Sequence, residues 1–159
     1  MPYFAAVFAR TPQGWEGAEL ALEEVETLDD LADTLRDSAV EDEPVLLLVE
    51  EEDEWFGIAR VDGNDDPRTF LSDVRAAATS EPASLLYDEA DTGEPLEEDD
   101  DSAPPIIAEP AGDADLLLDL GTSADELMEL ATEEGLLPAD ALWSLAERAG
   151  FSDELDRLR

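Results

Sequence analysis

Carboxylates are the most abundant chemically active side chains in this 159-residue sequence, which has 45 aspartate and glutamate residues. Paired carboxylates can act as general acid and base, as in glycosidases, and carboxylate oxygens can bind calcium. Lysine, histidine and cysteine are absent, and all eight basic residues are arginines. Their absence excludes thiol and imidazole catalysis, Schiff-base chemistry and ordinary zinc sites. We therefore predict that the protein is not an enzyme and uses no metal and no other cofactor.

One spacing resembles that of a calcium-binding loop. Asp62, Asn64 and Asp66 would occupy its first, third and fifth positions, and Asp73 its twelfth. The loop needs glycine at the sixth position, where this sequence has Pro67, and it prefers glutamate at the twelfth. The pattern therefore favours an ordinary turn rich in aspartate and asparagine.

An acidic turn followed by two aromatic residues is a candidate partner contact. The acids of Glu50–Glu54 could steer a basic protein by charge, and Trp55 and Phe56 could anchor it. The alternative is a tight hairpin whose aromatic side chains belong to the core. Because neighbouring side chains of a strand point to opposite faces, this hairpin would bury one ring and leave the other exposed.

Three of the scarce arginines, Arg60, Arg68 and Arg75, lie close together in the sequence. Arginine forms bidentate contacts with carboxylates and phosphates. Acids are so numerous here that we expect internal ion pairs. Alternatively, Arg68 and Arg75 are seven residues apart and would form a positive patch on one face of a helix.

The formal net charge of −37 restricts the class of partner. DNA, RNA and anionic membranes are bound through lysine and arginine, so they should repel this chain. The charge favours a basic protein surface as partner, although the acids could also serve solubility alone. No apolar run reaches the roughly 18 residues of a spanning helix, and the N-terminus lacks the basic start of a signal peptide. We predict a cytoplasmic protein that binds neither nucleic acid nor membrane.

The elements that would position these residues indicate an α+β domain over residues 1–87. Apolar runs predict strands at 3–9, 15–22, 45–49, 55–61 and 84–87, and helices are predicted to begin at Thr27 and Pro67. Their order is roughly ββαββαβ. We expect a small mixed or antiparallel sheet with two helices, in which residues 45–49 form a central strand because they are apolar on both faces.

The composition changes after residue 87. Residues 88–115 contain 12 acids, four prolines and no basic residue, which is typical of a disordered linker. Residues 116–159 predict a short helical bundle, with a capping box at Ser123 and Glu126, a helix start at Pro138 and a helix end at Gly150. This module is small for independent stability, so we expect it to pack on the N-terminal domain or on a partner.

Four segments occur in the order found in one known family: PYFAAVFARTPQGW, VLLLVEEEDEWFGIARVDG, PRTFLSDVRAAATS and DLLLDLGTSADELMELATEEGLLPADALWSLAERAGF. The chain resembles the tRNA adenosine deaminase-associated proteins, an actinobacterial family named for its gene neighbourhood and without an established activity. The resemblance covers nearly the whole chain outside the linker and carries over no catalytic residues. It is closest at 52–56 and 68–73, which indicates these candidate partner-binding residues: Glu52, Asp53, Glu54, Trp55, Phe56, Arg68 and Asp73.

A tRNA adenosine deaminase of this type uses a zinc site built from histidine and cysteine. This chain has neither residue, so the resemblance implies a helper of the enzyme. Our leading hypothesis is a non-catalytic acidic interaction module that binds a basic surface, such as the tRNA-binding face of the deaminase, and regulates or assists that enzyme. The alternatives are a nucleic-acid-mimicking inhibitor of a basic protein, a carboxylate-dependent enzyme, and a small folded protein with an unrelated partner.

Overall fold

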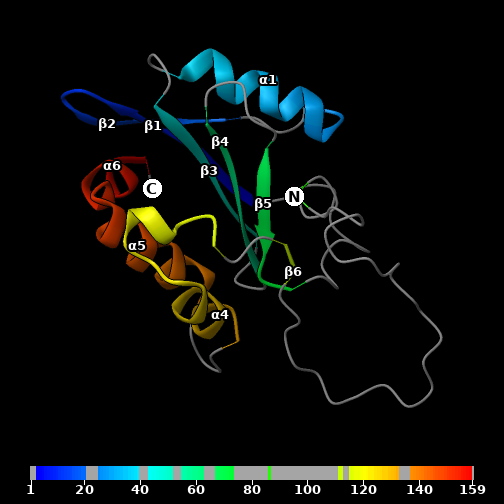
Figure 1. Cartoon of the computed structure of the whole chain (residues 1–159), viewed down its shortest axis with the longest axis vertical. Helices are drawn as coiled ribbons and strands as arrows, with labels where there is room; N and C mark the ends of the chain where they lie inside the picture. The colour runs from blue at the N-terminus through cyan, green and yellow to red at the C-terminus, as the bar shows by residue number, and fades with distance from the viewer. Residues whose placement is uncertain are drawn as a thin grey trace.

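A computed structural model describes residues 3–20, 25–39, 43–51, 55–62, 67–73, 86, 111–112, 115–132 and 137–158. Its antiparallel sheet has the strand order β2-β1-β3-β4-β5-β6. Helix α1 covers one face, and the C-terminal helices cover the other (Figure 1). The elements are β1 (Tyr3–Thr11), β2 (Gly14–Glu19), α1 (Leu28–Ser38), β3 (Pro44–Glu51), β4 (Trp55–Asp62), β5 (Arg68–Leu71), β6 (Ala111–Gly112), the 3-10 turn η3 (Leu118–Leu120), α4 (Ala124–Thr132), α5 (Pro138–Ala149) and α6 (Ser152–Leu158).

The central strands have apolar residues on both faces because both faces of the sheet are covered. In β3, Leu46 and Leu48 belong to the core beneath the C-terminal helices, here called the C-terminal core. Val45, Leu47 and Val49 belong to the core beneath helix α1, here called the α1 core. Burying one such side chain contributes about 1.5–3 kcal/mol. The prediction that residues 45–49 form a central strand is confirmed.

Helix α1 begins where the sequence predicts because Thr27 caps it. The Thr27 hydroxyl accepts a hydrogen bond from the Asp30 N–H at 3.1 Å, and Asp29 and Asp30 lie in the first turn. Acidic side chains are favourable at this positive end of a helix. Leu31 and Leu35 point the other way and are fully buried in the α1 core.

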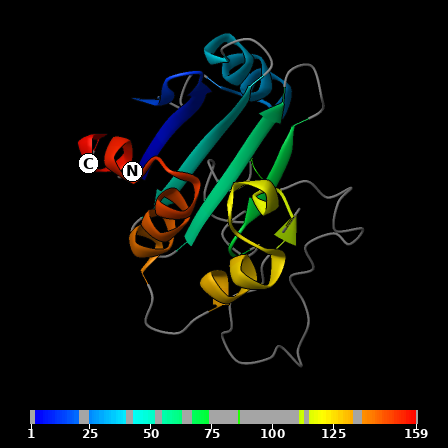
Figure 2. The same cartoon turned by 60° about the vertical axis from the view of Figure 1, so that its left-hand side comes forward.

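The C-terminal helices share a hydrophobic core with the sheet. Figure 2 shows α5 and α6 on the side of the strands opposite α1. The rings of Phe8 and Phe151 stack with their centroids 4.4 Å apart, and Leu145 and Leu155 are buried in the same cluster. The segment that follows residue 115 therefore packs on the N-terminal sheet.

Local signals set the ends of these helices as predicted. The Glu126 N–H donates to Ser123 Oγ at 3.2 Å, and the Ser123 N–H donates to Glu126 Oε1 at 3.4 Å, which is the capping box. Pro138 lies in the first turn of α5. Gly150 ends α5 with a φ of +103° and donates its N–H to the carbonyl of Ala146, in the left-handed conformation that glycine adopts without strain.

The α+β class is confirmed, but the order of elements differs from the prediction. Residues 68–71 do not begin a helix; they form β5, antiparallel to β4. Phe70 lies in the C-terminal core and Leu71 in the α1 core, an alternation that belongs to a strand. The described elements of the first 87 residues therefore follow the order ββαβββ.

The end of the predicted linker is also corrected. Ala111–Gly112 form β6, which pairs with β5, so these two residues belong to the sheet. Residues 88–110 of the linker and residues 74–80 of the predicted helix lie outside the described residues. Of the predicted strand at 84–87, only Leu86 is described. It is helical, so the prediction of a strand is wrong at this residue, and it is buried in the α1 core.

Candidate partner interface

Both aromatic residues of the predicted contact turn are buried. Trp55 lies in the α1 core and Phe56 in the C-terminal core, and each is 2% exposed. The Trp55 indole N–H donates to Glu51 Oε1 at 3.1 Å, which satisfies its polar group. The expectation that one ring stays exposed is wrong, because helices cover both faces of the sheet. The acidic residues Glu52, Asp53 and Glu54 lie outside the described residues.

The remaining predicted contacts lie at opposite ends of β5. Asp73 follows Ser72, whose hydroxyl accepts a hydrogen bond from the Phe56 N–H at 2.9 Å. It therefore lies at the same end of the sheet as the acidic turn. Arg68 pairs in register with Arg60 at the other end of the strand. The structure thus places Asp73 near Phe56 and places Arg68 apart from them.

Arg60 makes a buried connection between the sheet and the C-terminal segment. Its side chain is 6% exposed, and its guanidinium donates to both carboxylate oxygens of Asp119, at 2.6 and 2.9 Å. It also donates to the Leu116 carbonyl at 2.5 Å and to Asp62 at 3.0 Å. For Arg60, the predicted internal ion pairing is confirmed. Its hydrogen-bonding groups are occupied in the fold, so they do not offer a phosphate-binding fork.

This arrangement lowers the pKa of Asp119. The largest cause is the hydrogen bond from Arg60, which outweighs the opposing effect of burial, and the positive charge of Arg68 adds to it. The pKa of Arg60 is raised, mainly by the same hydrogen bond. A carboxyl group that stays ionised suits a structural ion pair. Sequence reasoning missed Asp119 because it lies 59 residues from Arg60.

A groove lies at the far edge of the sheet, between the edge strand β2 and helix α6. It measures about 360 Å³ and is lined by Trp15, Glu16, Gly17, Glu154, Arg157 and Leu158. The Trp15 indole N–H donates to the Ala149 carbonyl at 3.2 Å, and its ring lies 4.9 Å from that of Phe151. These two contacts hold Trp15 in place as one wall of the groove. The sequence alone did not predict this groove.

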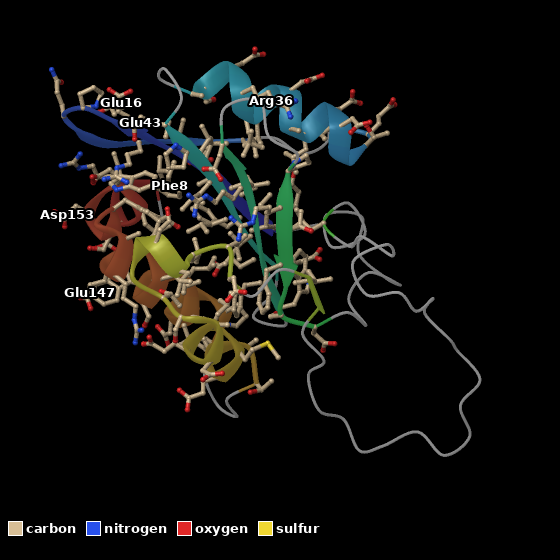
Figure 3. The ribbon with its side chains drawn as sticks, in the orientation of Figure 1. Phe8, Glu16, Arg36, Glu43, Glu147 and Asp153 are labelled. Atoms are coloured by element: carbon tan, nitrogen blue, oxygen red, sulfur yellow. The ribbon has the colours of Figure 1, made fainter. Side chains whose placement is uncertain are left out.

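Exposed acidic residues lie on both elements that form this groove. Glu16 and Glu19 are exposed on β2, and Asp153 and Asp156 are exposed on α6. Figure 3 shows Glu16, Glu147 and Asp153 directed outward on the same side of the molecule. The groove lining itself contains both signs of charge, because Arg157 lies there with Glu154.

Neither a metal site nor a membrane-spanning helix is present among the described residues. No three carboxylates of the described segments are placed to hold a metal ion. Within the same segments, no helix has the length and apolar character needed to cross a membrane.

The fold is that of a small α+β protein. One buried arginine, Arg60, is paired with carboxylates inside the fold, and many other acids are exposed on the surface. The chain belongs to the Rv3753c-like tRNA adenosine deaminase-associated protein family, whose model matches residues 3–152. No curated protein and no solved structure matches the chain. The family name describes proteins associated with the deaminase and does not describe the deaminase itself.

Proposed function

We propose that this chain is a non-catalytic accessory protein that binds a tRNA adenosine deaminase and regulates or assists it. The observation that carries the proposal is the match of the deaminase-associated family over residues 3–152. The missing histidine and cysteine support the non-catalytic role, since deamination of this type requires both as zinc ligands. Such a partner places the protein in the cytoplasm, where it would work beside tRNA.

Charge supports the choice of partner surface. An enzyme that binds tRNA must present lysine and arginine to phosphates, and such a surface attracts a protein with a net charge of −37. Exposed acids of the described residues lie on several elements, including Asp37 on α1, Glu147 on α5 and Asp153 on α6. Glu52, Asp53, Glu54 and Asp73 remain proposed contacts, whereas Trp55 and Phe56 lie within the core.

Size-exclusion chromatography of the two purified proteins tests the proposal. At about 50 mM NaCl the Debye length exceeds 10 Å, and we expect the proteins to elute together; at about 500 mM the complex should dissociate. Separate elution at both salt concentrations would show that the deaminase is not the partner.

The second candidate is a protein that mimics nucleic acid. Exposed Asp29, Asp33 and Asp37 recur every fourth residue on α1, which places them on one face with a rise of about 6 Å between successive carboxylates. A mimic would displace tRNA from the deaminase, whereas an accessory protein could bind beside it. Electrophoresis of labelled tRNA with the enzyme and increasing amounts of this chain separates the two: loss of the tRNA complex indicates mimicry, and a slower band indicates a ternary complex.

A further inference from the structure

Helix α5 has an exposed face opposite the face that packs on the sheet. Its buried residues all lie on one side: Pro138, Ala141, Leu142, Leu145 and Ala146. Asp140, Trp143 and Glu147 are three and four residues apart, so their side chains lie on one face, and all three are exposed. Leu137, directly before the helix, is also exposed, and Figure 3 shows Glu147 directed away from the sheet. Leu137, Asp140, Trp143 and Glu147 are here called the outer face of α5.

Trp143 is the exposed aromatic residue of the described segments, with 38% of its surface accessible. The indole N–H groups of Trp15 and Trp55 donate to acceptors inside the fold, at Ala149 and Glu51. Trp143 makes no such bond within the described residues. Part of its ring is therefore open to a partner, and tryptophan is enriched among the residues that contribute most to binding between proteins.

The two acids beside Trp143 are not neutralised by a neighbouring arginine. Asp140 and Glu147 form no ion pair with another described residue. Arg148 follows Glu147 in the sequence, but its position lies about 100° further around the helix. Its guanidinium forms an ion pair with Glu126 of α4. The outer face of α5 therefore combines an accessible aromatic ring with two unpaired carboxylates, one on each side of the ring.

This combination selects among possible occupants. A second copy of this chain would bring the same two acids together across a two-fold axis, and two chains of net charge −37 also repel each other at longer range. Nucleic acids and anionic membranes would bring phosphates against the carboxylates. An apolar protein surface would bury both carboxylates without partners, which is costly. A basic protein segment pairs with both acids and can also stack a cation on the ring.

We infer that the outer face of α5 is the docking site for an arginine-rich segment of the partner protein. A guanidinium group stacks on the Trp143 ring, and its N–H groups donate to Asp140 or Glu147. Both acids are within reach, because side chains three or four residues apart on a helix have Cβ atoms about 5–6 Å from each other. Arginine suits this site better than lysine, since its planar group both stacks and donates in a fork. That the partner is basic rests on the proposed function, and the structure adds the surface that recognises it.

An alanine-based peptide of about 15 residues with arginine at every fourth position is a direct probe, and its binding to the full chain can be followed by fluorescence anisotropy. We expect the double variant Asp140→Asn/Glu147→Gln to bind about fivefold more weakly, because it removes two exposed ion pairs. The matched control is Asp29→Asn/Asp37→Asn, which removes one acid from each end of α1, on the opposite face of the sheet. It should change affinity by less than about twofold. Equal loss in both double variants, or no binding by the unaltered chain, would overturn the inference.

Stacking on the ring is tested separately with Trp143→Phe and Trp143→Leu. Both keep an apolar side chain, but only phenylalanine keeps a ring face, so the leucine variant should bind the peptide several-fold more weakly than the phenylalanine variant. Circular dichroism checks that both are folded, and equal affinities of the two folded variants would rule out stacking. If the leucine variant fails to fold, quenching of the unaltered chain's tryptophan emission by acrylamide decides the same question. The bound peptide should reduce this quenching, and unchanged quenching would contradict the inference.

The same charge variants separate this inference from the proposed function when they are mixed with the deaminase. If the enzyme binds the unaltered chain and the Asp140→Asn/Glu147→Gln variant equally well, the outer face of α5 is not the contact although the accessory role stands. If the peptide requires these two acids and no deaminase complex forms, the docking site stands and the deaminase is not the partner.

Discussion

At the scale of single residues, Arg60 shows how a scarce positive charge is used in an acidic chain. It is buried in the central strand β4, and its carboxylate partners are the neighbouring Asp62 and the distant Asp119. An arginine at such a position holds the start of the C-terminal segment against β4. The pattern of acids around it predicted an ion pair but could not identify Asp119, because contacts between distant residues depend on the finished fold.

Asp119→Asn should destabilise the fold. The Asp119 side chain is 61% exposed, which weakens the pair through solvent screening, but Arg60 remains buried and loses its bidentate acceptor. We expect the free energy of unfolding to fall by about 1–2 kcal/mol, measured by urea denaturation. Asp125→Asn removes an exposed acid of α4 and is the control. Equal stabilities of the two variants would contradict this role of Asp119.

The same pair gives a pH dependence. The pKa of Asp119 in the folded protein lies below its usual value of 3.8. The ion pair therefore stabilises the fold fully above pH 3.8, and this stabilisation is lost as the pH falls through the folded pKa. The difference in unfolding free energy between the unaltered chain and Asp119→Asn should be constant near neutral pH and shrink below the usual value. A difference that grows as the pH falls would contradict the assigned shift.

At the scale of elements, the sequence predicted those parts of the fold that depend on neighbouring residues. Thr27, the Ser123–Glu126 box and Gly150 set helix ends within one turn, and the structure confirms each of them. Strand β5 was missed because proline, here Pro67, is common at the first position of a helix. The strand has four residues, which are too few to show the alternation of inward and outward side chains. Only its pairing with β4 makes this segment a strand. The groove was missed because it forms where two elements from opposite ends of the chain meet.

Ser123→Ala tests the local capping signal of α4. Loss of the hydroxyl leaves the Glu126 N–H without its acceptor and should lower the unfolding free energy by about 1 kcal/mol. Ser144→Ala lies within α5, where alanine is the better helix former, and should be neutral or slightly stabilising. Thermal unfolding followed by circular dichroism compares them, and a capping role is excluded if Ser123→Ala unfolds at the temperature of the unaltered chain.

At the scale of the whole molecule, one sheet supports two cores, and the C-terminal helices form a wall of one of them. Phe8, Leu46 and Ile58 of the sheet are fully buried in this C-terminal core. The predicted division into units at 1–87, 88–115 and 116–159 therefore has a physical test. The test is whether residues 1–87 keep their structure when residues 116–159 are removed.

A chain ending at residue 115 should not fold stably. It would expose the face of the sheet that contains Phe8 and Leu46, and it would lose both Asp119 and the Leu116 carbonyl as partners of Arg60. We expect binding of a hydrophobic dye, aggregation, and no cooperative unfolding transition. A sharp transition in a monomeric truncated chain would show that residues 1–87 form an independent domain.

We propose that this acidic protein binds a tRNA adenosine deaminase through charge. Isothermal titration of the full chain into the deaminase at increasing NaCl concentrations tests it most directly. We expect saturable binding at about 50 mM NaCl that weakens steadily as the salt concentration rises. No detectable binding at low salt, or an affinity that salt does not change, would contradict it.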